Sequence, residues 1–499
     1  LLMDSFLIPV LFLLSIGMAI VYNLGSNVVV GEISYVTKAL AAVLQLGVTM
    51  DYSIFLWHSY EECREIYDTK EEAMAKAIAA TITSVVGSSI TTIAGFIALC
   101  FMSFTLGLDL GVVMAKGVLL GVIGCVTILP ALILGCDKAI NRMRHKSLVP
   151  NTDKISKFII KRFPIFIVIM LALIAPAIYG YTHTDVYYDL TLSLPENLDS
   201  VVSTKVLQDK YDLSSANMIL VNSDMASQKI IDMVDEIDDV PGVSSAIAME
   251  KITGADLPKD FLPESLSGEL RGENYEMILL ASEYKTGSDE ANEQCNSIEK
   301  IIKKYDENGM LVGEAACTRD LINITNEDFK RVSAVSIGVI FIIIAVIYGS
   351  VLLPVLLVAL IEFAIFVNMA IPCYTGTVLP FIASIVIGTI QLGATVDYAI
   401  LMTTRYRKER NDGKNKKEAV GIALHTSIPS IIASALSFFG ATFGVGVYSS
   451  IDMISSLCTL MARGAIISMI SVICILPAMF MLFDKLIIKT SLTFKNKRA

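Results

Sequence analysis

The sequence predicts a polytopic α-helical membrane protein in which one helical bundle is duplicated and one α+β domain lies outside the membrane. Three observations support this fold class. The mean hydropathy is +0.65 and only 18% of residues are charged, whereas soluble domains carry about 25% charged residues. One phrase occurs twice, as QLGVTMDYSIFL at 45–56 and as QLGATVDYAILM at 391–402. A long polar stretch, 183–331, interrupts the apolar segments.

Ten segments are apolar enough to cross a bilayer, which takes about 20 residues each. They are 7–24, 34–57, 76–101, 110–135, 163–182, 332–349, 351–371, 379–402, 421–446 and 455–483. The predicted domains are a first, incomplete transmembrane repeat of about four helices (1–137), a cytoplasmic linker (138–162), the first helix of a second repeat (163–182), an outer domain (183–331), the remaining five helices (332–485) and a basic cytoplasmic tail (486–499).

Basic residues in the short loops predict the orientation. Lys and Arg gather at 403–419, in the linker and in the tail, so the positive-inside rule places these segments in the cytoplasm. Alternating the spans from there puts 183–331 outside. This segment is rich in Asp and Glu, and the whole chain has a net charge of −10. Nucleic acid is therefore not an expected partner.

The duplication extends beyond the repeated phrase. MAKG (114–117) matches MARG (461–464), LPALILGCDK (129–138) matches LPAMFMLFDK (476–485), and MDSFLIPV (3–10) matches YGSVLLPV (348–355). A period this long predicts two copies of one unit, related by an axis along the membrane normal, with sites at their interface. The first copy lacks the leading span, the outer domain and the span that follows it, so we expect an N-terminal truncation. A naturally shortened protein is the alternative.

The outer domain shows alternating strand and helix patterns. Strands are expected at 215–221, 243–249, 275–282 and 310–313, and helices near 226–238 and 288–304. This order is β-α-β-β-α-β, the split ferredoxin-like pattern. Cys295 and Cys317 fall in this domain. Whether they form a disulfide stays open, because sequence spacing alone does not establish a pairing.

Each copy of the phrase carries an Asp-Tyr pair, Asp51-Tyr52 and Asp397-Tyr398, within an apolar span. A carboxylate inside a bilayer costs roughly 3 kcal/mol on insertion scales, so it needs a partner or a function. Burial and a second nearby carboxylate both favour the neutral acid, which lets such a group exchange protons near neutral pH. One turn away, Gly47 and Gly393 share the face of each Asp and admit a neighbouring helix. Purely structural aspartates are the alternative.

Other polar residues repeat with the Asp-Tyr pairs. A hydroxyl stripe at i, i+3, i+7 spacing lines one face of the next span in each copy and offers relay groups, although helix packing is the more common role of such residues. Its members are Thr81, Ser84, Ser88, Ser427, Ser430 and Ser434. Lys116 and Arg463 are candidate charge partners of the aspartates, with snorkelling to the interface as the default. Trp57 and Tyr60 are expected to be interfacial anchors.

These features together resemble the RND superfamily, and most closely its MmpL-type branch of bacterial hydrophobe and amphiphile exporters. The resemblance rests on the GxxxDY phrases, Gly47–Tyr52 and Gly393–Tyr398, on the duplicated bundle and on the β-α-β-β-α-β domain. It implies an RND-type bundle, a porter domain and a proton relay through both Asp-Tyr pairs. It also implies a bacterial plasma-membrane exporter driven by protons, with a lipid or amphiphile as substrate.

Two other functional classes remain open. A lipid-sensing or assembly protein, as in sterol-sensing relatives of this fold, would keep the architecture without proton flux. An intramembrane aspartyl protease also needs two Asp residues, but it explains neither the outer domain nor the duplication. We therefore expect no enzyme activity. The four His and nine Cys show no metal-ligand spacing, and no P-loop is present, so neither a metal nor another cofactor is expected. Homo-oligomerisation stays open, as does the role of Glu362.

Overall fold

The computed structural model describes residues 3–29, 31–145, 152–211, 214–254 and 270–491. Two compact units account for the chain. The first unit comprises Leu1–Val186, Asp328–Ser449 and Met453–Ala499. The second unit comprises Tyr187–Glu327 together with Ser450–Asp452. Each unit is described by itself below.

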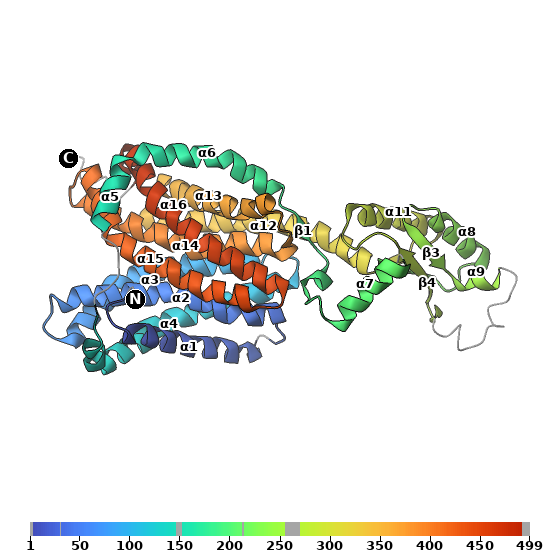
Figure 1. Cartoon of the computed structure of the whole chain (residues 1–499), viewed down its shortest axis with the longest axis horizontal. Helices are drawn as coiled ribbons and strands as arrows, with labels where there is room; N and C mark the ends of the chain where they lie inside the picture. Colours follow the sequence, from blue (N-terminus) through green and yellow to red (C-terminus); the bar gives the residue numbers. More distant parts are fainter. Residues whose placement is uncertain (1–2, 30, 146–151, 212–213, 255–269, 492–499) are drawn as a thin grey trace. The chain divides into compact units, whose positions relative to one another are not determined.

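Long apolar helices build the first unit (Figure 1). They are α1 (Leu7–Gly25, continued by the 3-10 helix η1, Ser26–Val29), α2 (Tyr35–Arg64), α3 (Lys70–Leu99), α4 (Thr105–Arg142), the short α5 (Thr152–Lys161), α6 (Phe163–Thr182), α12 (Glu314–Tyr348), α13 (Leu352–Thr375), α14 (Phe381–Asn411), α15 (Lys416–Tyr448) and α16 (Asp452–Thr490). The part of α12 up to Glu327 belongs to the second unit. Within the described residues nine of these helices are long and apolar enough to cross a membrane. The bent α3 makes a tenth when its two halves count as one span. The protein is thus mostly helical and polytopic, as the sequence predicts.

Polar side chains mark where several of these helices begin. The hydroxyl of Ser34 accepts a hydrogen bond from the backbone N–H of Val36 at the start of α2. The side chain of Thr69 does the same for α3, and the side chain of Asn415 does so for α15. Such caps satisfy N–H groups that have no partner inside the helix, and each typically stabilises it by about 1 kcal/mol.

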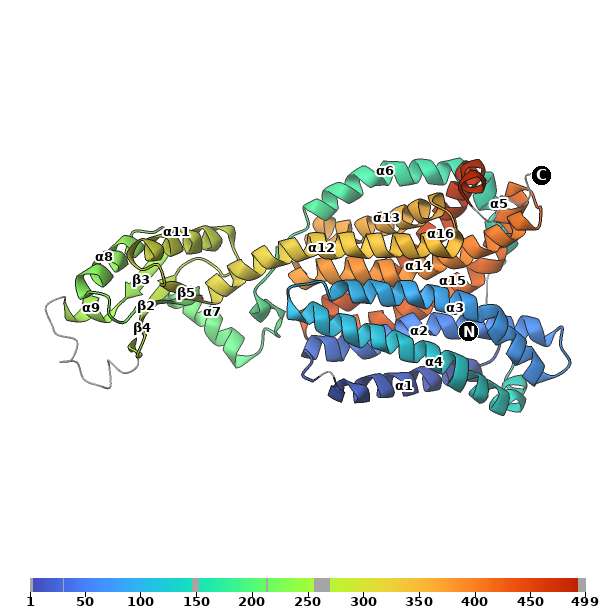
Figure 2. The ribbon, with the colours of Figure 1, turned by 180° about the vertical axis from the view of Figure 1, so that it is seen from behind.

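The most extensive contacts between the two repeats involve four helices. Helix α3 of the first repeat packs on α14 of the second, and α2 packs on α15. Figure 2 shows α3 alongside α14. Within the repeats, α1 packs on α4, and α6 packs on α13. Two isolated antiparallel β-bridges occur at corresponding places in the repeats, one between Ser5 and Arg144 and one between Ser350 and Ser491. The repeated sequence therefore folds into repeated contacts.

The second unit is an α+β body. Its sheet contains β2 (Ser215–Asn222), β3 (Val243–Ile247), β4 (Tyr275–Ser282) and β5 (Met310–Gly313), in the antiparallel order β3-β4-β2-β5. Helices α8 (Ser227–Asp238) and α11 (Asp289–Tyr305) pack against it, with α7 (Asp199–Tyr211), α9 (Met249–Thr253) and the 3-10 helix η2 (Leu190–Ser193) as smaller elements. Alternate residues of β2 are buried, and Ile219 and Val221 enter the core with Ile230, Ile278 and Ile298. The short strands β1 (Val186–Tyr187) and β6 (Leu379–Pro380) form a separate pair.

Several helices extend beyond the segments predicted for them; α12, for example, begins at Glu314 within the predicted outer domain. Helix α4 continues to Arg142, so it enters the predicted linker, and the rest of that linker contains α5. The basic end of α4 favours this extension, because cations stabilise the negative end of a helix dipole. Helix α16 continues to Thr490 into the predicted tail, of which residues 492–499 lie outside the described residues. Helix α5 packs on α15, which explains why a segment too short to span a membrane is ordered.

Candidate functional site

The two Asp-Tyr pairs lie on α2 and α14, deep inside the first unit. Asp51 and Asp397 are 1% and 2% exposed, and Tyr52 and Tyr398 are fully buried. Each pair reaches across to the other repeat. Tyr52 lies close enough to Asp397, and Tyr398 close enough to Asp51, for each tyrosine to interact electrostatically with the aspartate of the other repeat. The two carboxyl groups also repel each other when both are charged.

Hydroxyl groups of the opposite repeat surround each aspartate. The hydroxyl of Ser434 on α15 lies close enough to Asp51 to stabilise its negative charge. The hydroxyls of Ser88, Thr91 and Thr92 on α3 stand in the same relation to Asp397. Because Ser88 and Ser434 are 346 residues apart, as are the two aspartates, the same arrangement occurs twice around the interface.

Among the residues that the structure describes, no basic side chain interacts with these carboxylates. Neither oxygen of Asp397, nor Oδ1 of Asp51, has a hydrogen-bond partner of normal geometry among the described residues. The same holds for the hydroxyls of Tyr52 and Tyr398 within that part of the chain. A buried charge without a partner is strongly unfavourable, so the neutral acid is the favoured form at rest. Such a group can take up and release a proton as its surroundings change.

Small residues bring the two repeats into close contact beside the aspartates. A Cβ atom added to Gly47 would lie 2.7 Å from the ring of Phe438 on α15, and one added to Gly95 would lie 3.2 Å from the Cα atom of Gly393 on α14. The hydroxyl of Thr92 donates a hydrogen bond of 3.0 Å to the carbonyl oxygen of Gly393. Gly47 and Gly393 therefore allow the helix contact that the sequence predicts.

The hydroxyl stripe divides into two groups. Ser88 and Ser434 are buried beside the aspartates, and Ser427 is also buried. Thr81 and Ser430 instead line a pocket nearer the helix ends, and Thr81 donates a hydrogen bond of 2.7 Å to the carbonyl oxygen of Ala77. The side chain of Ser84 lies outside the described residues. Only part of the predicted stripe is therefore at the aspartates.

Lys116 and Arg463 have partners other than the aspartates. The ammonium group of Lys116 donates hydrogen bonds to the backbone oxygen of Asn23 and to the side chain of Asn27. The guanidinium group of Arg463 donates two bonds of 2.8 Å to Asn368, one to its side chain and one to its backbone oxygen. Both basic residues thus fasten α4 or α16 to a neighbouring helix of the same repeat.

Sequence reasoning missed the buried amides to which these bonds lead. Asn23 donates to the side-chain oxygen of Gln45 at 2.9 Å, and Asn368 donates to that of Gln391 at the same distance. Gln45 donates in turn to the backbone oxygen of Gly117. The sequence contains the signal, because Gln45 and Gln391 recur at the 346-residue spacing of the Asp-Tyr phrases and Asn23 and Asn368 recur at a spacing of 345. An uncharged amide in an apolar span is a weaker sign of function than a carboxylate, because burying an amide costs less free energy than burying a charge.

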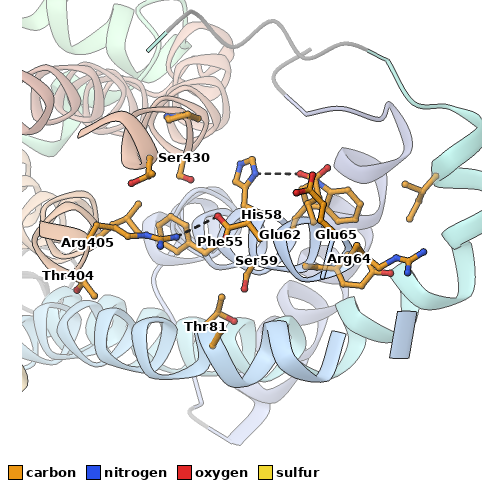
Figure 3. A pocket seen from close by; sticks show the side chains of 18 of the residues that line it. Phe55, His58, Ser59, Glu62, Arg64, Glu65, Thr81, Thr404, Arg405 and Ser430 are labelled. Atoms are coloured by element: carbon orange, nitrogen blue, oxygen red, sulfur yellow. Dashed lines mark ion pairs between the residues drawn. The ribbon is translucent and has the colours of Figure 1, made fainter. Parts of the chain in front are cut away.

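A polar pocket of about 770 Å³ lies between the repeats, where α2 and α14 end; we call it the inter-repeat pocket (Figure 3). Glu62 on α2 and Arg405 on α14 approach to 3.7 Å across it, and His58 lies 3.6 Å from Glu61. The ion pair between Glu62 and Arg405 joins the two repeats. Trp57 and Tyr60 also line this pocket and are nearly fully buried, so the prediction that they anchor the protein at the lipid interface is wrong.

A second cluster of polar residues occurs in both repeats, and its first-repeat copy lines this pocket. In the second repeat, the carboxylate of Asp484 accepts a hydrogen bond of 2.5 Å from Tyr406 and an ion-paired bond of 2.9 Å from Arg410. The corresponding residues of the first repeat are Tyr60, Arg64 and Asp137, and all three line the pocket. The hydroxyl of Tyr60 has no hydrogen-bond partner within the described ranges. We call the cluster closed in the second repeat, where these bonds form. We call it open in the first repeat, where Tyr60 lies near Asp137 and Arg64 without a hydrogen bond of normal geometry among the described residues.

Within the described residues no group of three or more His, Cys, Asp or Glu side chains is arranged to hold a metal ion. The described cysteines are all free thiols, including the buried Cys295 and the exposed Cys317. The site is therefore characterised by two buried acids, hydroxyls and a polar pocket.

These features define the class: a multi-pass membrane protein with a duplicated bundle and an acidic pair at the interface of its repeats. The family comparison agrees, because the MMPL family matches residues 1–149 and 203–497. The chain belongs to the MMPL family.

Several proteins match this chain at low identity. The membrane protein YdfJ of Bacillus subtilis (strain 168) is 21% identical over 81% of this chain and 57% of its own length. The putative membrane protein ActII-3 of Streptomyces coelicolor is 23% identical over 86% of this chain and 59% of its own length. The probable transport protein MmpL4 of Mycobacterium leprae is 24% identical over 54% of this chain and 30% of its length. The chain thus spans a little over half the length of the first two relatives.

Proposed function

We propose that this protein is a secondary transporter that uses the proton gradient to export lipids or other hydrophobic or amphiphilic compounds across a bacterial plasma membrane. The carrying observation is the pair of buried carboxyl groups, Asp51 and Asp397, at the contact between the repeats. Membership of the MMPL family and similarity to proteins named as probable transport proteins support the transport part of the proposal.

The proposed mechanism follows from the electrostatics of that contact. When Asp397 loses its proton, its charge faces Ser88, Thr91 and Thr92 on α3, so the attraction between α14 and α3 increases. When it regains the proton, that attraction weakens. Asp51 and Ser434 give the same switch between α2 and α15. Alternating protonation therefore moves one repeat relative to the other, as in alternating access.

We further propose that the second unit is a ferredoxin-like porter domain on the outer side of the membrane. Its antiparallel strand order, β3-β4-β2-β5, and its two packed helices support that assignment. The basic loops at 403–419 and 138–162 support the orientation. In this arrangement the domain receives the substrate after it leaves the bilayer.

The first test measures gradient-dependent export. Proteoliposomes hold the protein and a fluorescent amphiphile, and a pH gradient is imposed across the membrane. We expect the wild type and Asp412→Asn, an exposed loop substitution, to move the dye. Asp51→Asn and Asp397→Asn should lose gradient-dependent movement, because Asn cannot bind and release a proton.

The alternatives give different results in the same experiment. If all four folded proteins behave alike, the aspartates are structural, and the sensing or assembly function gains support. Cleavage of a membrane-embedded peptide that disappears in both aspartate variants would instead indicate an intramembrane protease. Folding is checked in each case by the thermal unfolding temperature in detergent.

A further inference from the structure

A third membrane carboxyl group lies outside the aspartate pair. Glu362 sits near the middle of α13 and forms no ion pair or hydrogen bond recorded among the described residues. The spacing that relates Asn23 to Asn368 places Gly17 opposite it in the first repeat, and space around Gly17 is open. A carboxylate inside a bilayer costs roughly 3 kcal/mol, so a single unrepeated one needs its own function.

Glu362 lines a small cavity of mixed polar and apolar character between α6, α12, α13 and α14. Five hydroxyl residues share its wall: Tyr181, Ser333, Ser336, Ser384 and Thr389. The cavity volume is about 30 Å³, enough for water but far too small for a lipid chain, since one water needs about 10–15 Å³. A proton carried by water fits this space, whereas an amphiphile does not.

A second observation indicates that the cavity serves a polar ligand. Ser336 is 1% exposed, and its hydroxyl has no hydrogen-bond partner within the described residues. An isolated buried hydroxyl is unfavourable, so this group needs a partner in the cavity. Water bridging Ser336 and Glu362 would have the two or more polar partners that a buried water requires.

The cavity and Asp397 share helix α14. Helix α14 contributes Thr389 and Leu392 to its wall, and Asp397 lies eight and five residues farther along the same helix. At a rise of about 1.5 Å per residue, the cavity ends about 7.5 Å along the helix axis from Asp397. In the proposed orientation Tyr181, at the end of α6, marks the outer side of the cavity.

The charged surroundings of Glu362 are sparse. Tyr181 of α6 interacts electrostatically with Glu362, and α14 faces it with the hydroxyls of Ser384 and Thr389. Helix α12 contributes Phe329, Ser333, Ser336 and Ile337. Among the described residues no Lys or Arg lines the cavity. A metal cation would need several oxygen ligands, more than one carboxylate supplies, so a proton is the ligand that fits.

We propose that Glu362 is the proton-uptake group through which protons from the outer side reach Asp397. Its carboxylate takes a proton from outer water and passes it through cavity water to the carboxylate of Asp397. One proton moves, and Glu362 returns to its starting form. This proposal rests on the proposed transport function. Since the first repeat has Gly17 at the corresponding position, this route of proton uptake serves the second repeat alone.

The deciding experiment compares the dependence of export on outer pH. Glu362→Gln should lower the export rate about tenfold at alkaline outer pH, a modest proton-relay effect, and leave it near wild type at acidic outer pH. Glu362→Asp should restore most of the rate. The matched control is Glu32→Gln, an exposed glutamate in the loop between α1 and α2, which should leave the profile unchanged.

Three results would overturn the assignment. An unchanged pH profile in folded Glu362→Gln would remove Glu362 from the proton path. Loss at every pH, not restored by Glu362→Asp, would indicate a role in folding or in the transport step itself. A rate that follows sodium concentration instead of outer pH would indicate a cation site.

Infrared spectroscopy separates this proposal from the transport proposal. The carbonyl band of a protonated carboxylic acid should titrate with pH in the wild type and in Asp397→Asn, and one such band should be missing in Glu362→Gln. If export fails in the wild type but this band titrates, the transport function is contradicted while proton binding at Glu362 holds. If no band is lost in Glu362→Gln, the proton-uptake group is contradicted whatever the transport result.

Discussion

Two carboxylates at matching sequence positions have different partners. Asp484 holds Tyr406 and Arg410, while Asp137 in the first repeat belongs to the open cluster at the inter-repeat pocket. The side chain of Asp484 is 7% exposed and that of Arg410 is 17% exposed, so their ion pair is largely shielded from water. Removing one member of a shielded pair leaves the other charge without compensation.

We therefore predict different stabilities for two equivalent substitutions. Asp484→Asn should destabilise the protein by about 3 kcal/mol, because it leaves Arg410 uncompensated. Asp137→Asn should cost less than about 1 kcal/mol, as for exposed pairs. Thermal unfolding in detergent, followed by circular dichroism, measures both. Equal unfolding temperatures for the two variants would show that the open and closed clusters do not differ in strength.

The sequence predicts the position of a residue best where burying that residue has a high cost in free energy. Asp51 and Asp397 were recognisable because a charge within an apolar span is expensive and occurs twice. The partners of Lys116 were not recognisable, because a long side chain can reach several neighbours. Trp57 was misplaced for a related reason: an aromatic residue at a helix end suits a lipid interface, but its indole here donates to Asp4 in the segment before α1.

At the scale of helices, the contact between α3 and α14 depends on the absence of side chains. Gly95 and Gly393 meet backbone to backbone, whereas Gly440 on α15 has no atom within 4 Å of an added Cβ. Both Gly95 and Gly440 are helical glycines in the same span of the two repeats. Substitutions at these two glycines therefore form a matched pair for testing whether function requires α3 and α14 to approach closely.

We predict that Gly95→Leu separates α3 from α14, abolishes gradient-dependent export and lowers the unfolding temperature. Gly440→Leu should keep both properties, because its side chain enters open space and leucine favours helix more than glycine. Export in proteoliposomes and thermal unfolding measure the effects. Normal export by Gly95→Leu would show that the aspartates work without close contact between these helices.

Hydropathy predicts the long helices well, because crossing a bilayer requires a run of apolar residues. It fails for α5, which has only ten residues and four charges, and which is stabilised by packing on α15. The pattern of Ile155, Phe158 and Ile159 has helical spacing and was the available signal. Lateral partners such as α3 with α14 depend on tertiary contacts that the sequence pattern does not specify.

For the molecule as a whole, the repeats share a framework but differ in detail. The amide pairs, the aspartates and the backbone bridges all recur, while Glu362 and the closed Asp484 cluster occur in the second repeat alone. Duplication therefore predicts the symmetric scaffold, and divergence between the copies determines which half takes up protons under our proposal. The repeat in the sequence reveals the symmetric scaffold. The functional difference between the copies becomes visible only in the side-chain contacts of each copy.

The orientation of the chain can be tested with two thiols of the second unit. Cys317 is exposed, and Cys295 is 2% exposed within α11. Burial raises the pKa of the Cys295 thiol; Arg319 opposes this effect, and Asp320 and Glu299 add to it. Because the thiolate is the reactive form, Cys295 should react slowly at neutral pH for two reasons, poor access and a small thiolate fraction.

We predict that a membrane-impermeant maleimide added to intact cells labels Cys317 and spares Cys295. Cys317→Ser should remove this label, whereas Cys295→Ser should leave it, and unfolding in denaturing detergent should expose Cys295 in the Cys317→Ser protein. Labelling of Cys317 only after cells are permeabilised would place the second unit in the cytoplasm. That result would reverse the orientation derived from the basic loops, and with it the side from which Glu362 receives protons.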